Sequence, residues 1–440
     1  MASAKLTRTN GTATTGNIYT WSAWVKRGLS STQETLVRTR TDDNNYSRIR
    51  FDDDGTLVFE DRISSSTVTN LVSNAQHRDL SSWYHVLVRV DYTQATAGDR
   101  ARIYVNGSEV TYSSTTRQSQ SGSSYFNSAN SHDLGHYNSN NYFNGSMTHV
   151  HFTDGYSYAP STFGETDSTS GIWKPKTAPS VTYGNNGYFL KMENSGAMGT
   201  DSSGNSNTFT VSGTLTQNVD TPSNNFATLN PLDVGRWTQS NTFSNGNLTV
   251  TTSDYISANG SLAVSSGKFY WEVEYDTAGG SNIYAGAGII NYDGWDGTGG
   301  GGSGANTYIY ATSGQKVNSA SGSAFGATLS AGDIVGIALD MTNGFLYFSK
   351  NGTWQNSGDP TSGASGTGSA YGSISGTIGC HLYDGSGSIA HEFSANFGQG
   401  YFGTTAVSSA QADDGGLGIM EYDVPANYRV LCTKNIKDYG

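Results

Sequence analysis

Three carboxylates in the stretch WEVEYD, at Glu272, Glu274 and Asp276, have the residue types needed for acid–base chemistry. A glycoside hydrolase uses two carboxyl groups that flank the sugar bond, one as the acid and one as the nucleophile or base. Laminarinase-type glucanases supply these groups from a Glu-x-Asp-x-x-Glu strand, and the order in this chain differs. No Ser/His/Asp motif context occurs either. We therefore expect a solvated strand face at these positions and no enzyme activity.

Metal-ligating side chains occur in three short stretches. His149 and His151 of HVH alternate along a strand and share one face, but no third ligand is visible, so a polar strand face is favoured. The acidic residues 52–54, and Asp293 and Asp296 in YDGWDGTGGGG, offer the oxygen ligands that calcium prefers. Neither loop matches an EF-hand, and hairpin turns are the favoured interpretation. No cofactor is predicted; calcium would suit these loops, but no specific motif indicates it.

Exposed aromatic side chains in polar loops are candidates for glycan binding, because a ring can stack on the apolar face of a sugar. Trp295 lies in a glycine-rich loop between Asp293 and Asp296, and the loop HYNSNNYFNGS carries a similar group in the first half of the chain. The candidate ligand-binding residues are Trp295, Asp293, Asp296, Tyr137, Tyr142 and Phe143. Loop packing or contact with a neighbouring subunit is the alternative for both groups, and such loops also suit adaptable protein recognition.

The composition of the 440-residue chain favours β-structure with glycine-rich loops. Only 14% of the residues are charged, whereas 56 are glycine and 12% are aromatic, and long windows with a helical period are absent. The net charge of −12 argues against a nucleic-acid or anionic-membrane partner. There is no 18-residue apolar run and no apolar signal segment, so we expect no membrane insertion. Cys380 and Cys432 fit no metal or redox spacing and are expected to be free buried thiols.

Strand and turn signals recur along the whole chain. In GDIVGIALDMTNGFLYFSKNGTW, residues 334–340 and 345–350 read as strands, and the pairs at Asn343 and Asn351, each followed by glycine, predict type I′ turns. WYHVLVRVD followed by ARIYVNG shows the same order in the first half, so two sandwiches of one class are expected. Trp24, Trp83 and Trp271 belong to strand patterns and are predicted to be core residues.

The proline-containing stretch 215–240 is too long for a hairpin loop and is predicted to link two domains, at residues 1–214 and 241–405. The segment 406–440 follows the second domain. Its YRVLCTKNI stretch is expected to add an edge strand, to dock against the linker or to meet another subunit. The strand signals begin near the first residue, so no fibre shaft or anchoring domain is expected in this chain.

The second half resembles a SPRY domain in SSGKFYWEVE, YIYATSGQKVNS, GDIVGIALDMTNGFLYFSKNG and ANFGQGYF, which occur in the family's order. The first half is similar to laminin-G-like, concanavalin A-like domains in TWSAWVKRG, WYHVLVRVD, RIYVNG and MTHVHFTDGYSYAPSTFGE. The resemblance implies an all-β fold of two concanavalin A-like antiparallel β-sandwich (jelly-roll) domains.

The combination of these domains with DTPSNNFATLNPLD and YRVLCTKNI resembles proteins of tailed phages, marine phages in particular. That resemblance implies a non-enzymatic virion protein, with other virion subunits as partners. We expect a homo-oligomeric tail-fibre or appendage component that recognises a host surface glycan or protein. A head-decoration or other structural subunit is the alternative, and a glycan hydrolase is the third hypothesis.

Overall fold

The alternation of residues along β2 (Ile18–Arg27) shows how the first half of the chain builds its core. Trp21 and Val25 point into the apolar cluster between two sheets, whereas Trp24 points to the opposite face and stacks on His85. This period of two is that of an extended strand covered on both faces. Trp24, Trp83 and Trp271 are all buried, as the strand patterns predict.

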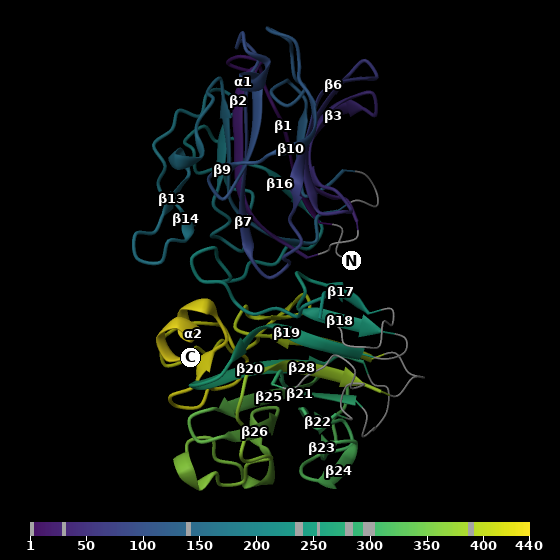
Figure 1. Ribbon diagram of the computed structural model, residues 1–440, viewed down its shortest axis with the longest axis vertical. Helices are drawn as coiled ribbons and strands as arrows, with labels where there is room; N and C mark the ends of the chain where they lie inside the picture. The colour runs from purple at the N-terminus through teal and green to yellow at the C-terminus, as the bar shows by residue number, and fades with distance from the viewer. Residues whose placement is uncertain are drawn as a thin grey trace. The chain divides into compact units, whose positions relative to one another are not determined.

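The computed structural model describes residues 4–28, 32–137, 142–233, 241–252, 256–277, 285–293, 304–385 and 391–440. The chain separates into two units, Met1–Gln217 and Asn218–Gly440, each with its own core (Figure 1). Each unit is a sandwich of two sheets, which confirms the all-β fold class predicted from the sequence.

The first unit has an eight-stranded and a six-stranded antiparallel sheet among its described residues. The eight-stranded sheet has the order β10 (Tyr112–Thr116), β6 (Ser66–Gln76), β5 (Thr56–Ile63), β4 (Asn45–Phe51), β3 (Glu34–Asp42), β11 (Ser131–Leu134), β1 (Lys5–Thr9) and β16 (Thr210–Ser212). The six-stranded sheet has the order β15 (Tyr188–Leu190), β12 (Gly145–Asp154), β2, β7 (Trp83–Asp91), β8 (Ala101–Val105) and β9 (Ser108–Glu109). The hairpin of β13 (Gly164–Thr166) and β14 (Trp173–Pro175) and the short helix α1 (Ala97–Arg100) lie outside these sheets.

The second unit repeats this architecture with two further sheets. One has the order β17 (Thr242–Ser244), β18 (Thr249–Thr252), β29 (His391–Asn396), β20 (Lys268–Tyr275), β25 (Asp333–Asp340), β26 (Phe345–Lys350) and β27 (Thr353–Trp354), and β32 (Arg429–Val430) pairs parallel with β20. The other has the order β19 (Ile256–Val264), β28 (Ile378–Asp384), β21 (Ala285–Asn291), β22 (Thr307–Ala311), β23 (Gln315–Asn318) and β24 (Ser321–Ala324). The pair β30 (Tyr401–Phe402) and β31 (Thr405–Ala406) and the C-terminal helix α2 (Thr433–Tyr439) complete the unit.

The two Asn-Gly pairs of the second unit form different turns. Asn351 and Gly352 both have positive φ angles, 48° and 75°, as the predicted type I′ turn between β26 and β27 requires. The type I′ prediction is wrong for Asn343, because four residues separate β25 from β26 and only the last of them, Gly344, has a positive φ. Asn343 instead donates its backbone N–H to Oδ1 of Asp340 at 3.0 Å.

Part of the stretch predicted to be a linker packs within the second unit. Ala227 and Leu229 are buried in its core, and the N–H of Ala227 donates to the carbonyl oxygen of Leu431 at 3.0 Å. Phe226 and Cys432 form a further backbone bridge. The YRVLCTKNI stretch therefore adds the short strand β32 and also docks against residues 224–227.

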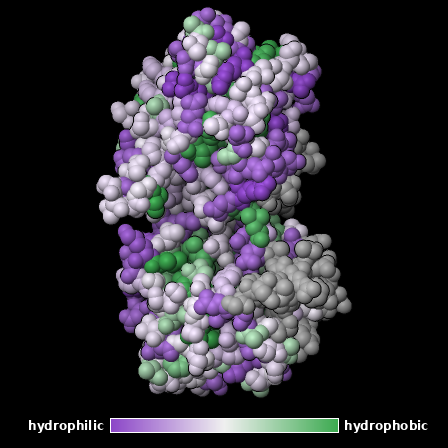
Figure 2. All heavy atoms as spheres, in the orientation of Figure 1, coloured by the Kyte–Doolittle hydropathy of each residue, from purple (hydrophilic) through white to green (hydrophobic). Residues whose placement is uncertain are grey.

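Cys380 and Cys432 are free and buried, as predicted. In the part of the chain that the structure describes, no helix has the length and apolar composition needed to cross a membrane. The face of the molecule in Figure 2 is mostly hydrophilic, with hydrophobic residues in small scattered groups.

Candidate functional site

The outer surface of the eight-stranded sheet of the first unit carries a row of arginines. The register places Arg38 of β3 opposite Arg48 of β4, and Arg48 opposite Glu60 of β5, so alternate residues of neighbouring strands share the face away from the core. Ile49 and Phe59 point inward from the same strands. We call this surface the arginine face; it consists of Arg38, Arg40, Arg48, Arg50, Arg62, Glu60, Asp133, Tyr46 and Tyr137.

Asp133 of β11 fixes the guanidinium group of Arg38. Arg38 donates to Oδ2 of Asp133 from Nη2 at 2.7 Å and from Nε at 3.2 Å, and Thr7 donates to Oδ1 at 2.9 Å. Burial raises the pKa of Asp133, but the hydrogen bonds from Arg38 and Thr7 outweigh it and hold the pKa below the usual value. The carboxylate is therefore charged, and Arg38 has a single orientation.

Glu60 fixes the two arginines of β4. Its Oε2 accepts from Nη1 of Arg50 at 2.9 Å and Nη2 of Arg48 at 3.2 Å, and its Oε1 accepts from the hydroxyl of Tyr46 at 2.8 Å. Burial raises the pKa of Glu60, whereas Tyr46 and the two guanidinium groups lower it, and the net pKa is lowered. Asp52, at the end of the row, accepts from Nη2 of Arg50 at 3.2 Å.

Tyr137, predicted from the sequence as a ligand-binding residue, lies over this row. The centroid of its ring is 4.3 Å from Cζ of Arg48 and 5.4 Å from Cζ of Arg38, and its edge meets the ring of Tyr46 at 6.1 Å. Cation–π contacts of this kind hold an aromatic ring and a guanidinium plane together. Tyr137 is therefore part of the arginine face and is only partly buried.

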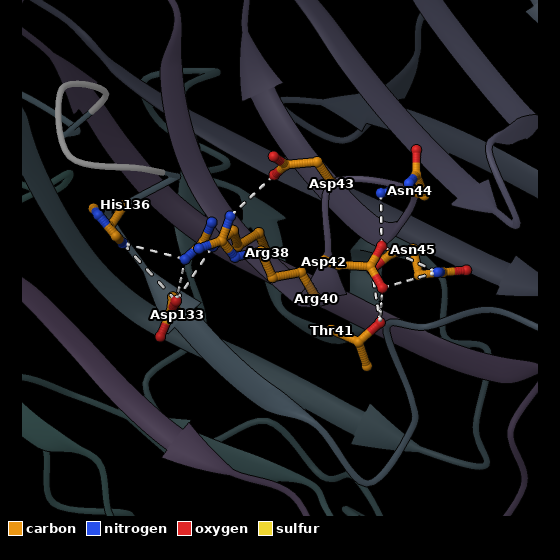
Figure 3. A network of polar contacts seen from close by, with 9 residues as sticks. All are labelled: Arg38, Arg40, Thr41, Asp42, Asp43, Asn44, Asn45, Asp133 and His136. Carbon is orange, nitrogen blue, oxygen red and sulfur yellow. Dashed lines mark hydrogen bonds and ion pairs between the residues drawn. The ribbon is translucent and has the colours of Figure 1, made fainter.

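Hydrogen-bond donors outnumber acceptors on the arginine face. Among the described residues, Nη1 of Arg38 and the Nε atoms of Arg48 and Arg50 are buried without a hydrogen-bond partner. Arg40, at the rim, has 36% of its side chain exposed and pairs with Asp43. Figure 3 shows this pair beside the contacts that join Arg38, Asp133 and His136. Fixed donors and acceptors next to an aromatic ring suit the hydroxyl, amide and carboxylate groups of a polar ligand.

The turn between β3 and β4 is built by the side chains of Asp42 and Asn45. Asp42 accepts from the backbone N–H of Asn44 at 2.7 Å and from Nδ2 of Asn45 at 3.1 Å (Figure 3). Asn45 Oδ1 in turn accepts from the N–H of Ser64 at 2.8 Å and the hydroxyl of Tyr125 at 3.1 Å. The hydrogen bonds from Asn45 and Asn44 lower the pKa of Asp42. The turn is an ordered rim of the arginine face.

The remaining predicted ligand-binding residues lie in different environments. The ring of Tyr142 meets that of His136 at 4.6 Å, and Phe143 packs against the core of the first unit. Asp293 donates its backbone N–H to Oδ1 of Asn291 at 2.9 Å. Trp295 and Asp296 lie outside the described residues.

The structure confirms a hairpin turn at residues 52–54, where the carboxylate of Asp54 accepts from the N–H of Thr56 at 2.8 Å. A polar strand face is wrong for His151, which is buried and stacks on Phe189 with ring centroids 3.9 Å apart. In the described part of the chain, His, Cys, Asp and Glu side chains form no group of three or more that could hold a metal ion.

The prediction of a solvated strand face is wrong for Glu272. Its side chain is fully buried and accepts hydrogen bonds from the backbone N–H groups of Glu421 at 2.8 Å and Tyr422 at 2.9 Å. The cover is a segment that lies about 150 residues further along the chain. A strand pattern shows which residues alternate but not what packs over each face.

Sequence analysis missed the arginines of this face. Their signal is present in two successive strands, TLVRTR and YSRIRF, where arginines recur at alternate positions with a short turn between them. Alternation in a hairpin places such residues on one face. Twelve of the chain's 14 arginines precede residue 218, which is a second signal.

Comparison with known families agrees with both resemblances. Residues 2–159 match the concanavalin A-like lectin/glucanases superfamily, and residues 268–387 match the SPRY domain. The chain therefore carries a concanavalin A-like, laminin-G-like domain followed by a SPRY domain. No curated protein matches the chain.

Three solved structures illustrate the similarity to known proteins. The SPRY domain of human HERC1 shares 17% identity over 38% of this chain and 96% of that chain, with a TM-score of 0.30. Stonustoxin shares 19% identity over 39% of this chain and 27% of its own, with a TM-score of 0.28. A native heptameric SAP-like pentraxin from Limulus polyphemus shares 15% identity over 36% of this chain and 77% of its own, with a TM-score of 0.25.

Proposed function

We propose that this chain is a non-enzymatic recognition protein whose first domain binds a glycan or protein on a cell surface through the arginine face. The observation that carries the proposal is the placement of Tyr137 over Arg38 and Arg48, which Asp133 and Glu60 hold in fixed orientations. A site whose side chains are already ordered loses little conformational entropy when it binds a ligand. Tyrosine and arginine are also enriched among the residues that dominate binding energies.

We propose binding and not hydrolysis because Glu272, the carboxyl group that the sequence offers as a catalytic candidate, is not accessible to a substrate. Glu272 is excluded from solvent and accepts four hydrogen bonds from neighbouring protein groups. A glycosidase acid needs to meet the sugar bond directly. On the arginine face, Arg38, Arg48 and Arg50 are themselves buried and support Tyr137. A polar ligand could contact the partly exposed side chains of Tyr137, Glu60 and Arg40 without reaction.

The setting we propose is the particle of a tailed phage, with the chain as a tail-fibre or appendage component that contacts the host. The stretches DTPSNNFATLNPLD and YRVLCTKNI, together with the order of the two domains, support this setting. Weak single sites would then act together through several copies on one particle.

The binding proposal can be tested with the purified chain on immobilised host surface polysaccharides and glycan arrays. Tyr137→Ala and Arg48→Lys should each weaken binding at least tenfold, because the first removes the ring and the second removes the planar fork of the guanidinium group. Arg102→Ala, which changes an arginine of β8 paired with Glu109 instead, is the matched control and should bind normally. Equal binding by all four proteins would contradict the role of the arginine face.

The setting can be tested by labelling purified virions with gold-conjugated antibody against the chain. Gold at the tail or on projecting fibres is the expected result. Gold spread over the head would favour a decoration subunit whose loops bind neighbouring subunits. Absence of the chain from particles would contradict a virion protein of either kind.

A further inference from the structure

The segment of residues 408–430 lies across the outer face of the sheet that contains β20, β25 and β26. We call it the strap. Met420, Tyr428 and Val430 are buried, and they belong to one apolar cluster with Tyr270 and Tyr347 of the sheet. This cluster is separate from the core between the two sheets of the second unit. The strap also meets loops of the second unit, because the N–H of Ile419 donates to the carbonyl oxygen of Gly398 at 2.9 Å and the hydroxyl of Tyr428 donates to that of Pro360 at 3.1 Å.

Glu272 of β20 anchors the middle of the strap. Its Oε2 accepts from the backbone N–H of Glu421 at 2.8 Å, and its Oε1 accepts from that of Tyr422 at 2.9 Å. The hydroxyl of Tyr270 donates to Oε1 at 3.0 Å, and Nδ2 of Asn396 approaches Oε2 at 3.4 Å. One buried carboxyl group thus holds two consecutive amides of the strap.

The surroundings of Glu272 differ from those of several other buried carboxylates. Glu34, Asp133 and Asp340 each form an ion pair with an arginine or lysine. Among the described residues, all four donors to Glu272 are neutral, and no ion pair is formed by this side chain. A buried carboxylate without a cation is costly, because burial removes water from the charged form.

Several of the titratable groups near Glu272 are carboxylic acids. Glu274 and Asp276 follow on the same face of β20, and Glu421 of the strap acts electrostatically on Glu274. From the other packed elements, Glu392 of β29 acts on Asp276, and Asp333 of β25 acts on the hydroxyl of Tyr422. The hydroxyl groups of Tyr270 and Tyr422 are further titratable groups of this region. Cations are present as well: Lys350 of β26 pairs with Asp333 at 2.9 Å, and Lys268 of β20 lies 5.5 Å from the ring centroid of Tyr428 of the strap.

Burial raises the pKa of Glu272 to about 7, although its hydrogen bonds act in the opposite direction. Burial, together with the charge of Asp276, also raises the pKa of Glu274 to about 7. A carboxyl group that water reaches has a pKa near 4.3. Between pH 4.3 and about 7, Glu272 holds a proton when the strap is docked but not when the strap has left and water reaches the carboxyl group. Raising the pH through this range therefore lowers the stability of the docked strap.

The docked state has a place for this proton. If Oε1 of Glu272 is protonated, it can donate to the hydroxyl oxygen of Tyr270, 3.0 Å away, while Oε2 continues to accept from the strap. If the carboxyl is ionised, its charge stays buried away from water. Protonation therefore removes the cost of a buried charge without removing the anchor.

We propose that the strap is a pH-dependent cover of the second domain, closed when Glu272 and its neighbouring carboxyl groups hold protons and loosened when they ionise. The strap closes most tightly in mildly acidic solution. Above neutral pH it opens more often and exposes the sheet face beneath it. This inference does not depend on the function proposed for the arginine face.

Hydrogen exchange of the full chain tests the proposal, with protection factors corrected for the intrinsic effect of pH on exchange. Protection of the amides of Glu421 and Tyr422 should fall about tenfold from pH 6 to pH 8 for a single carboxyl with this shift. Amides of β2 serve as the internal reference and should not follow this change. Constant protection of the strap across the range would overturn the proposal.

Glu272→Gln keeps one carbonyl acceptor for the strap but cannot ionise, so the protection of the strap amides in this variant should change less than twofold over the same range. Glu109→Gln, which removes a partly exposed carboxyl of β9, is the control and should keep the full dependence. If Glu272→Gln fails to fold, Glu274→Gln, which contributes no hydrogen bond to the strap, should still reduce the dependence. Full pH dependence in either neutral variant would overturn the role of these carboxyl groups.

Discussion

Asn106 of the first unit and Asn351 of the second hold their hairpins in the same way. Each has a φ of 48° and is followed by a glycine with a positive φ. Oδ1 of Asn106 accepts from the backbone N–H of His85 in β7, and Oδ1 of Asn351 accepts from that of Ile334 in β25, both at 2.8 Å. Each asparagine also donates its own N–H to the carbonyl oxygen of that residue, at 2.9 Å and 2.8 Å. The two halves of the chain therefore share a turn down to its side-chain contacts.

Replacement of Asn106 or Asn351 should separate the two contributions of this turn. The alanine variants lose the hydrogen bond and replace asparagine, which tolerates positive φ, with a residue that rarely adopts it, and should lower the free energy of unfolding by about 2 kcal/mol. The glycine variants lose only the hydrogen bond and should cost about 1 kcal/mol. Denaturant unfolding of the full chain measures both. Asn343, which lacks a positive φ, is the control: its alanine variant should be no less stable than its glycine variant.

The extent to which the sequence predicts the fold can be seen in these turns. The strand runs, the Asn-Gly pair at Asn351 and the burial of Trp271 follow from local pattern, and the structure confirms them. The type I′ prediction is wrong at Asn343 because the type of a turn depends on where the preceding strand ends, here β25 at Asp340, and not on the Asn-Gly pair alone. Local residues specify a turn only when the lengths of the flanking strands are known.

The candidate site was predicted in part. Tyr137 was identified by its loop, but the arginines beneath it were not, because their grouping requires the register of β3, β4 and β5. The strand pattern predicts a solvated Glu272, and the structure buries this residue because its cover comes from the strap, far along the chain. Long-range packing decides both environments, and the alternation within one strand contains no information about it.

A fully buried ion pair joins Arg27 and Glu34 in the first unit. Nε of Arg27 donates to Oε2 of Glu34 at 2.7 Å, and neither side chain has exposed surface. Arg27 also donates from Nη1 to the carbonyl oxygen of His77 at 2.5 Å and lies 4.5 Å from the ring centroid of Phe51. The pair is thus enclosed by polar and aromatic contacts on several sides.

Glu34→Ala should lower the free energy of unfolding by about 3–5 kcal/mol, because it leaves the guanidinium group buried without its counter-charge. The double variant Arg27→Met with Glu34→Leu should lose less than this single variant, because no unpaired charge remains. Arg40→Ala, at the partly exposed pair with Asp43, is the control and should cost much less. A double variant that is less stable than Glu34→Ala would contradict this account.

Asp61 introduces a pH dependence into the first unit. Its carboxyl group is buried and accepts hydrogen bonds from Ser47, Ser124 and Tyr92. Burial raises its pKa to about 6. The stability it contributes is fully present below the ordinary aspartate pKa and is lost as the pH rises through about 6. The loss should reach about 3 kcal/mol by pH 7.

Asp61→Asn removes this titration while it keeps an acceptor for the surrounding hydroxyl groups. Unfolding of the wild type and the variant should be compared from pH 4 to pH 7.5, and their difference should change along the predicted curve. Asp54→Asn, in the exposed hairpin turn, should follow the wild type through the same window. A constant difference between wild type and Asp61→Asn would show that Asp61 has an ordinary pKa.

His85 should remain uncharged well into acid solution. It is fully buried, and burial lowers its pKa to about 3. Nε1 of Trp173 donates to Nδ1 at 3.0 Å, so Nδ1 carries no proton, and Nε2–H is left to donate to the hydroxyl of Ser22 at 2.8 Å. Nitrogen chemical shifts of the ring at pH 5 should therefore show the neutral tautomer with the proton on Nε2.

The same residue should weaken the fold in acid, with a sign opposite to that of Asp61. Below pH 6.5 the unfolded chain binds a proton that the buried imidazole does not, so stability falls by about 1.4 kcal/mol per pH unit until the native pKa is reached. Replacement of His85 with glutamine should reduce the dependence of the free energy of unfolding on pH. The free energies of unfolding of the wild type and the variant should be compared between pH 6.5 and pH 4. An imidazolium signal from His85 at pH 5 in the intact fold would contradict both the neutral tautomer and the loss of stability in acid. A protonated Nδ1 cannot accept the hydrogen bond from Nε1 of Trp173.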